Sequence, residues 1–313
     1  MPDELYTQAA HWTTWIIPYF FLGGIAGGSY FIAALLDLVG DREDRSLSRI
    51  GYLIAFPAIS LGLIMLVLDL NQRLRFWHMM LQNNDLGLAF KWWSPISYGT
   101  WVVSAFSFFS FVSFLAALVR PGDTPQRGPL RIFSKIQYGM GLLSKLFVAL
   151  GAFFGLWVAS YTGVLISVTN RPIWANSPLF GFLFLVSGLS TAAAAMYLFS
   201  HRRRSVPDDA LHRLTRFDDW SLGIELVVLV AAVASLVSIL GGLPSEWLVS
   251  RGLLLGLILL GVVVGGIIVP LVMQMRNHNA RGAALAATLV LIGGFFLRAV
   301  VVLSSETLER PVL

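Results

Sequence analysis

The chain has 313 residues, of which 57% are hydrophobic and only 12% charged, and its mean hydropathy is +0.75. Soluble globular proteins are about half apolar and about a quarter charged, so the composition excludes an ordinary soluble domain and indicates a polytopic membrane protein. The formal net charge of +5 comes from basic residues in short connections, and the lack of cysteine excludes disulfides, thiolate-bound iron–sulfur clusters and cysteine zinc sites.

Eight apolar stretches are each long enough to cross a bilayer, which takes about 20 residues. Backbone polar groups in lipid must be bonded within the protein, so we expect helices. The sequence therefore predicts an all-α integral membrane fold with two four-helix bundles, at 1–170 and 171–313. The predicted spans are 14–38, 48–70, 96–119, 141–167, 178–200, 220–241, 252–274 and 282–303.

The first apolar stretch, from Trp12 to Leu38, contains more glycine than an anchor needs. The segment before it, MPDELYTQAAHW, has no basic region, so we expect no cleaved signal peptide and a first span that directs insertion. Pro18 removes a helix hydrogen bond near one end of the span. Small residues let another backbone or a flat ligand approach a helix closely. The glycines concerned are Gly23, Gly24, Gly27 and Gly28.

The basic residues predict how the chain is oriented. Most Lys and Arg lie in the connections 1–2, 3–4, 5–6 and 7–8, which we expect to be cytoplasmic, with both termini outside the cytoplasm. In a bacterial cell this predicts the inner membrane. The connections 121–137 and 201–219 are typical of solvated cytoplasmic loops. Connection 71–95 is rich in Trp, Asn and Met, and we expect it to fold back onto the membrane surface.

Polar residues cluster after the second span. Asp69 ends the span, and Arg73, Arg75 and His78 follow in the run DLNQRLRFWHMM. One interpretation is an interfacial Asp–Arg pair that fixes a loop. The other is a wall of charged donors beside a redox ligand, with His78 able to pass a proton.

Tyr161 lies at the outer end of the fourth span, and Asn170, Arg171 and Pro172 follow in a short connection. Tyrosine is common at the membrane interface, and the connection can simply turn the chain, so a structural role is open. A functional alternative is convergence at the outer face, if the first four helices form one bundle. The converging residues would be Tyr19, Asp69, His78, Trp101 and Tyr161.

Four further charged residues lie within spans. Asp37 and Lys145 are near cytoplasmic ends, where snorkelling explains them. Glu225 is about one to two turns into the sixth span, and Arg298 is about one to two turns from the outer end of the eighth. The four are candidates for a proton path, and a structural ion pair between the last two is an equal alternative.

The histidines argue against haem. A haem held by two imidazoles inside the membrane needs His within spans, and all five histidines fall in loops or at span ends: His11, His78, His201, His212 and His278. No phosphate-binding loop, dinucleotide fingerprint, zinc motif or Ser-His-Asp order is present, so we expect no metal in this chain.

Three segments in order resemble one family. They are PYFFLGGIAGG in the first span, RFWHM after the second, and SYTGVLISVTNRPIW from the fourth. Together they are similar to the NrfD/PsrC family, the membrane subunits of polysulfide reductase-type and related molybdopterin oxidoreductases. Eight spans with both termini outside also resemble that family.

The resemblance implies a cofactor and partners. It implies menaquinone or ubiquinone bound near the outer face of the first bundle, without haem. It implies a docked four-cluster ferredoxin-like iron–sulfur subunit, a molybdopterin catalytic subunit, and a chain that is not catalytically complete alone. The physiological context would be electron transport in anaerobic respiration, with no nucleic-acid partner.

The resemblance also implies roles for residues. Tyr161 matches the family's quinone-contacting tyrosine, and His78 matches the histidine of the loop after the second span. Tyr19 falls where the family can carry a quinone-contacting histidine, and Ile16 replaces an asparagine. The expected catalytic residues are Tyr161, His78 and Asp69, and the expected quinone-binding residues are Tyr19, Gly23, Gly27, Arg75, Trp101, Asn170 and Arg171.

Two alternatives belong beside this hypothesis. One is a membrane subunit of alternative complex III, whose members tend to have more spans. The other is a secondary transporter, because Pro18 and the glycine run are also typical of a broken helix around a substrate site. The glycines at 265–266 and 293–294 could be the matching interruption in the second half.

Overall fold

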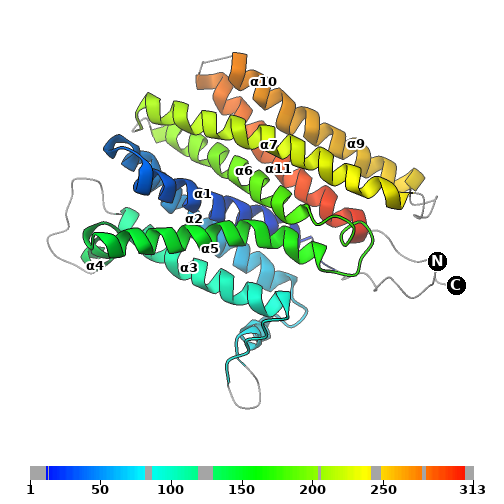
Figure 1. Ribbon diagram of the computed structural model, residues 1–313, viewed down its shortest axis with the longest axis horizontal. Helices are drawn as coiled ribbons and strands as arrows, with labels where there is room; N and C mark the ends of the chain where they lie inside the picture. Colours follow the sequence, from blue (N-terminus) through cyan, green and yellow to red (C-terminus); the bar gives the residue numbers. More distant parts are fainter. Residues whose placement is uncertain are drawn as a thin grey trace.

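The computed structural model describes residues 12, 14–81, 87–118, 130–203, 206–240, 248–276 and 280–306. Figure 1 shows long helices packed side by side. Apart from one isolated bridge between Leu81 and Leu88, the regular structure of the described residues is helical. Eight helices are long and apolar enough to cross a membrane, so the predicted all-α, eight-span fold is confirmed. The chain is therefore a multi-pass membrane protein.

Seven spans are single helices and the remaining one is composite. The single helices are α1 (Ile16–Val39), α2 (Arg45–Asp69), α3 (Pro95–Leu118), α5 (Leu142–Ser167), α6 (Phe180–Arg203), α7 (Asp208–Leu240) and α11 (Ala280–Glu306). The composite span joins η4 (Leu248–Gly252), α9 (Leu253–Gly261), η5 (Val262–Ile268) and α10 (Val269–Arg276). Short helices in the connections are η1 (Arg42–Asp44), η2 (Arg73–Met79), α4 (Leu130–Ser134) and η3 (Lys135–Gly139).

The composite span contains π-helical turns, in η4 and η5. Pro270 in α10 has no backbone N–H to offer the carbonyl of Gly266, four residues earlier. An expanded turn is one way to accommodate that missing bond. Gly266 also packs directly on Gly293 of α11, where an added Cβ would lie 2.6 Å from the Gly293 Cα. The glycines at 265–266 and 293–294 therefore mark the place where the composite span and α11 cross.

Two predicted loops are partly helical, and here the sequence-based prediction was wrong. The sixth span was expected at 220–241, but α7 begins at Asp208. Asp208 and Asp209 occupy its first turn, where negative charge stabilises the positive end of the helix dipole. Glu225 consequently lies nearly five turns into the helix. In the connection 121–137, the part from Leu130 onward is also helical, and 121–129 lies outside the described residues.

α1 is a continuous helix, which does not match the broken helix expected of a transporter. Pro18 is its third residue, within the first turn, where backbone N–H groups have no intrahelical partner. The proline therefore costs the helix little. The predicted transporter feature is absent from α1, and the glycines need another explanation.

Two of these glycines bring α1 against α5 and α6. A Cβ added at Gly27 would collide with the carbonyl oxygen of Gly155 on α5. A Cβ at Gly28 would lie 2.6 Å from the carbonyl oxygen of Gly188 and 2.7 Å from the Ala192 Cβ, both on α6. In both directions the neighbouring backbone occupies the space that a side chain would need.

The other two glycines, Gly24 and Gly23, differ in how much space surrounds them. A Cβ at Gly24 would lie 2.6 Å from Nη2 of Arg298, so Gly24 makes room for a guanidinium from α11. A Cβ at Gly23 would meet Val158 at 3.8 Å, an ordinary van der Waals contact. Gly23 is thus the one glycine of the four where a methyl group fits without movement.

α1 contacts helices from both halves of the chain. These are α2 and α5 in the first half, and α6 and α11 in the second. The beginning of α1 lies beside the end of α11, because the backbone N–H of Trp12 donates to Oε1 of Glu306 at 3.0 Å. Both ends of the described chain are therefore on one side of the bundle. The division at residue 170, and the side of the membrane that holds these ends, stay predictions.

We expect Gly28→Ala to destabilise the protein by about 1–3 kcal/mol, because the methyl group overpacks the α1–α6 contact. Gly23→Ala is the matched control, and we expect it to be neutral or stabilising by up to about 1 kcal/mol through higher helix propensity. Thermal unfolding of the purified variants in detergent measures both. Equal melting temperatures for the two variants would contradict this packing.

Candidate functional site

Tyr161 is held near the end of α5 by contacts with α3. Its hydroxyl donates to the backbone carbonyl of Pro95, the first residue of α3, at 2.7 Å. Its ring lies against Gly99, where any Cβ would collide with the phenol. The side chain is buried, with 6% of its surface exposed. Tyr161 is therefore a positioned hydroxyl and not a loosely held interfacial residue.

Tyr19 and Asp69 lie on the same side of the bundle as Tyr161. Tyr19 is buried in α1, and Gly62 of α2 faces it, because a Cβ there would be 3.5 Å from the Tyr19 ring. Asp69 follows Gly62 by seven residues, which is two helical turns along the same face of α2. Tyr19 is also near enough to Tyr161 to act on it electrostatically. Tyr19 and Tyr161 are thus close together, and Asp69 lies about two turns further toward the same end of α2.

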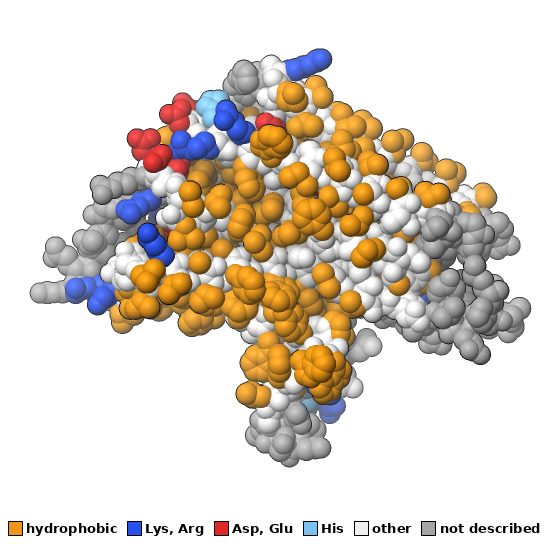
Figure 2. Space-filling view, viewed as in Figure 1, with side chains coloured by type: hydrophobic (Ala, Val, Ile, Leu, Met, Phe, Trp, Pro, Cys, Tyr) orange, Lys and Arg blue, Asp and Glu red, His pale blue; other side chains and the backbone are white. Residues whose placement is uncertain are grey.

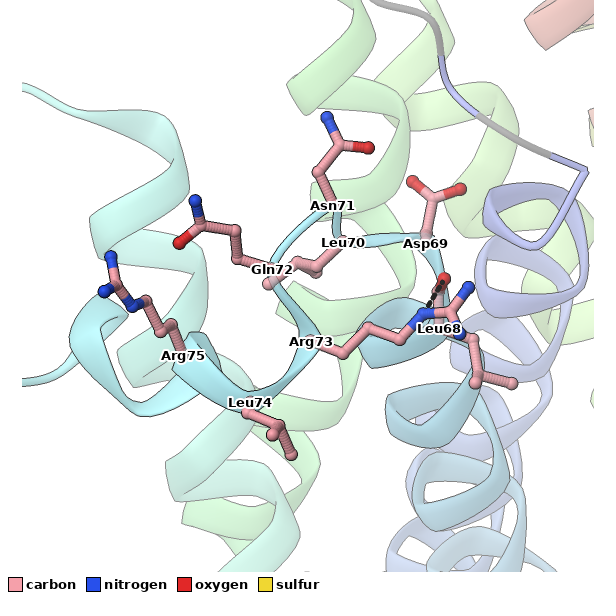
Figure 3. Close-up of a pocket in the computed structure, with 8 residues that line it drawn as sticks. All are labelled: Leu68, Asp69, Leu70, Asn71, Gln72, Arg73, Leu74 and Arg75. Atoms are coloured by element: carbon pink, nitrogen blue, oxygen red, sulfur yellow. Dashed lines mark hydrogen bonds between the residues drawn. The ribbon is translucent and has the colours of Figure 1, made fainter.

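A concavity of about 480 Å³ opens where α2 ends. It is lined by the turn from Leu68 to Arg75, drawn in Figure 3. Arg73 curls back so that its Nε donates to the carbonyl of Leu68 at 3.2 Å. Figure 3 shows Arg75 on the opposite side of the turn from Asp69. The concavity combines amide and guanidinium donors with leucine side chains.

The connection between α2 and α3 forms an arm, residues 73–81 and 87–94, which we call the aromatic arm. Both of its segments are hydrogen-bonded to side chains of α3. Met79 and Met80 accept from Thr100 and Ser104 at sulfur distances of 3.8 and 3.5 Å. Trp101 donates from its ring nitrogen to the carbonyl of Ala89 at 3.2 Å.

α3 separates His78 from Tyr161. Consecutive helical residues differ by about 100° around the axis, so Trp101 and Ser104 face away from Gly99 and Thr100 points to the side. Tyr161 touches the Gly99 face, whereas His78 belongs to the arm on the other face. His78 is half-buried, and its ring lies against that of Trp77 with centroids 3.8 Å apart and planes tilted by 41°. The structure thus places Tyr19 near Tyr161, with Asp69 further along toward the same end of the bundle, whereas His78 and Arg75 belong to the arm and Trp101 bonds it.

The aromatic arm projects sideways from the edge of the bundle beside α3, across the direction of the helices (Figure 1). Hydrophobic side chains gather on this projection in Figure 2. Trp92 and Trp93 are 76% and 65% exposed, and Phe76 is 52% exposed. Trp at the level where helices end is typical of a membrane interface. The arm fits the predicted folding back onto the membrane surface.

Asn170 and Arg171 lie in the connection between α5 and α6. Arg171 is buried, and its Nη2 donates to the carbonyl of Ser305 near the end of α11. Burial lowers the pKa of Arg171 from its ordinary value, and the Glu306 carboxylate opposes this. Trp174, fully buried, donates from its ring nitrogen to the Val301 carbonyl at 2.7 Å. Arg171 therefore attaches the connection to α11.

Arg298 is fully buried where α1, α6 and α11 meet. Its guanidinium donates to the carbonyl of Phe20 at 3.2 Å, to that of Gly294 at 2.7 Å and to the Ser187 hydroxyl at 3.2 Å. Glu225, also buried, acts on Arg298 through its charge, with Ser187 beside both. Arg298 thus bonds α11 to the backbone of α1 and to α6, while a proton path and a structural ion pair with Glu225 both stay predictions.

Asp37 is part of a polar cluster at the opposite end of α1. It accepts from the hydroxyl of Ser48 at 2.7 Å and from that of Tyr52 at 3.0 Å. Nearby, Tyr30 bonds Ser113, which donates to Gln137. These partners were not singled out from the sequence, although i, i+4 spacing of Ser48 and Tyr52 on one helix face was a usable signal. Lys145 is exposed on α5.

No group of three or more His, Asp or Glu in the described part of the chain is arranged to hold a metal ion. The five histidines include His11 and His278, which lie outside the described residues.

Comparison with known proteins identifies one family and several relatives. The family model for polysulphide reductase, NrfD, matches residues 5–308. The protein is 25% identical to one of the chains of polysulfide reductase from Wolinella succinogenes, over 97% of this sequence and 96% of that one. It is 28% identical to protein NrfD of Escherichia coli, over 89% and 90%. It is 23% identical to one of the subunits of selenate reductase from Mesobacillus selenatarsenatis, over 72% and 57%.

We expect Gly99→Ala to displace the Tyr161 ring and break its bond to Pro95, costing about 1–3 kcal/mol of stability through overpacking. Gly223→Ala in α7 is the control, since a Cβ there meets nothing within 4 Å. Chemical unfolding of both variants in detergent tests this. A Gly99→Ala protein as stable as the control would show that Tyr161 is not held as described.

Arg298→Leu should cost about 3–5 kcal/mol, because it leaves the Glu225 carboxyl buried without its cation. The double variant with Glu225→Gln should be less destabilised than the sum of the singles, by about 0.5–3 kcal/mol. A double-mutant cycle in unfolding free energy measures this coupling, with exposed Lys145→Leu as the control. Additive effects would contradict an interaction between the two residues.

Proposed function

The chain belongs to the NrfD polysulphide reductase family, and from this premise we propose that it is the quinone-reactive membrane subunit of a respiratory oxidoreductase complex. It is a multi-pass membrane protein of a family whose relatives are named as parts of polysulfide and selenate reductases. A membrane anchor in an oxidoreductase is consistent with that membership. The passage of electrons between membrane quinone and a docked partner is our proposal.

The observation that carries the proposal is the proximity of Tyr161 and Tyr19, with Asp69 and the concavity at the end of α2 on the same side of the bundle. Hydroxyl, amide and guanidinium groups can donate to the carbonyl oxygens of a quinone, and leucine side chains suit its apolar ring. The donor chemistry at this end of the bundle therefore fits a quinone head group. A bound quinone would supply the transfer of two electrons with two protons.

Tyr161 has a defined part in this proposal. Its only proton is donated to the Pro95 carbonyl, while its oxygen lone pairs remain able to accept. These lone pairs can accept a hydrogen bond from a quinol that reaches the buried hydroxyl. To donate to a quinone carbonyl, the hydroxyl must turn away from Pro95. Asp69, two turns beyond the Tyr19 level on α2, is placed to take up or release a proton at the membrane surface.

The partners follow from what this chain lacks. It has no cysteine to ligate an iron–sulfur cluster. We propose that electrons pass to an iron–sulfur subunit docked at the Tyr161 end of the bundle, and from it to a molybdopterin catalytic subunit. By the distribution of basic residues, this end faces out of the cytoplasm, in the inner membrane. The names of the two reductase relatives, which denote one component of each enzyme, support an assembly of several polypeptides.

We expect Tyr161→Phe to lower quinol-linked turnover of the purified complex about 10- to 100-fold, through loss of a hydrogen bond worth about 1.5–3 kcal/mol in the reacting complex. His78→Ala should lower turnover less, because α3 stands between His78 and Tyr161. Tyr138→Phe in η3, far from this end, is the matched control. Assembly is checked by co-purification of the other subunits.

Normal turnover in an assembled Tyr161→Phe complex would overturn the assignment of Tyr161. A larger loss in His78→Ala than in Tyr161→Phe would move the site to the arm side of α3. Quinone that extracts with the wild-type complex in stoichiometric amount supports binding, and its absence from the pure complex would contradict it.

A further inference from the structure

A small polar cavity lies within the second half of the chain, between α6, α7, α10 and α11. Its volume is about 10 Å³, close to what one water molecule needs. Asp218 and Gln274 face each other across it, and the Gln274 side-chain nitrogen donates to Oδ2 of Asp218 at 2.8 Å. The lining residues are Ala193, Ala194, Tyr197, Leu214, Thr215, Asp218, Gln274, Ala283 and Ala287.

Oδ1 of Asp218 and Oε1 of Gln274, which line this cavity, are buried without a hydrogen-bond partner, and so is Oγ of Ser190, which lies close to Asp218. Asp218 is 4% exposed, Gln274 8% and Ser190 0%. An unpaired buried polar atom is costly, so a group that satisfies all three is strongly favoured. The Gln274 amide is oriented by its bond to Asp218, so its free oxygen can only accept. The missing group must therefore donate hydrogen.

The charges around Asp218 decide its protonation. The groups that face it are Ser190 and Tyr197 from α6 and Gln274 from α10, while the α11 residues at the cavity are alanines. The charges that act on it are the carboxyls of Asp219 and Glu225, both on its own helix. A buried carboxylate among neutral and acidic groups is very unfavourable. A proton on Asp218 removes that cost.

We propose that Asp218 and Gln274 form a proton-holding site that retains one water molecule. The protonated Oδ1 of Asp218 donates to the water. The water donates its two hydrogens to Oε1 of Gln274 and to Oγ of Ser190. One proton and one water thus satisfy all three unpaired atoms.

The site lies on a line of polar side chains along α6. On one side of it, Ser190 is about one turn from Ser187, which bonds Arg298 beside the backbone of α1. On the other side, Tyr197 lines the cavity and stacks on exposed His201 with ring centroids 6.2 Å apart. The held proton therefore exchanges with solvent along α6 from the His201 end. Its use in quinone chemistry rests on the proposed function, whereas its presence does not.

Infrared spectroscopy of the purified full-length chain in lipid nanodiscs tests the site without any quinone assay. At neutral pH we expect a protonated-carboxyl band that disappears in Asp218→Asn and persists in Asp209→Asn, an exposed carboxyl on the same helix. Gln274→Leu, which keeps the carboxyl but removes its partner, should shift that band. A spectrum unchanged by Asp218→Asn in a folded protein would mean that Asp218 is ionised and would overturn the proposal.

Transfer into D₂O tests the route. We expect the Asp218 band to exchange several-fold more slowly in Tyr197→Phe, because the hydroxyl on the His201 side is lost, while Tyr98→Phe leaves the rate unchanged. Equal exchange rates in the two variants would overturn the α6 route. Since neither measurement uses turnover, the site stands or falls separately from the quinone assignment of Tyr161.

Discussion

Close backbone contact along α1 is the constraint on which the rest of the structure depends. Gly27 meets the backbone of α5, and Gly28 meets that of α6, at distances that exclude any side chain. Helices in lipid gain little from apolar contact alone, because lipid is as apolar as leucine, so small residues that permit tight packing are decisive. This contact holds α5, and with it Tyr161, in a fixed position relative to Tyr19. Gly27 and Gly28 thus act on the candidate site through helix placement.

The second consequence of that packing is a buried cation. Gly24 leaves space for Arg298, which lies over the rings of Phe184 and Phe21 at 5.4 and 5.7 Å and bonds two carbonyl groups in addition to Ser187. A guanidinium buried this deeply is tolerated only when its N–H groups are hydrogen-bonded and a nearby carboxyl balances its positive charge. Glu225 supplies the charge. Helices from the two halves of the chain are therefore joined by polar bonds, with apolar packing around them.

Hydropathy predicted the number and type of the spans, because each is long, apolar and nearly free of charge. It failed where a helix continues into polar sequence, as α7 does from Asp208. That error placed Asp218 in a solvated loop and hid the cavity with Gln274. The recurrence of Ala210, Leu214, Asp218 and Leu222 at helical spacing, all buried, was the available signal. The position of His78 could not be predicted, because it depends on which face of α3 turns toward α5, and the order of elements along the sequence gives no rotation angle.

The aromatic arm gives the molecule an asymmetric outline (Figure 1). It extends from the α3 edge, and the opposite edge is formed by α9 and α10 (Figure 1). A second copy or another membrane protein that approached the α3 edge would first meet tryptophan and phenylalanine side chains. The α9 edge has no such projection among the described residues and offers aliphatic side chains, including Leu254 and Leu257. The two edges therefore offer a lateral neighbour different side chains, aromatic at one and aliphatic at the other.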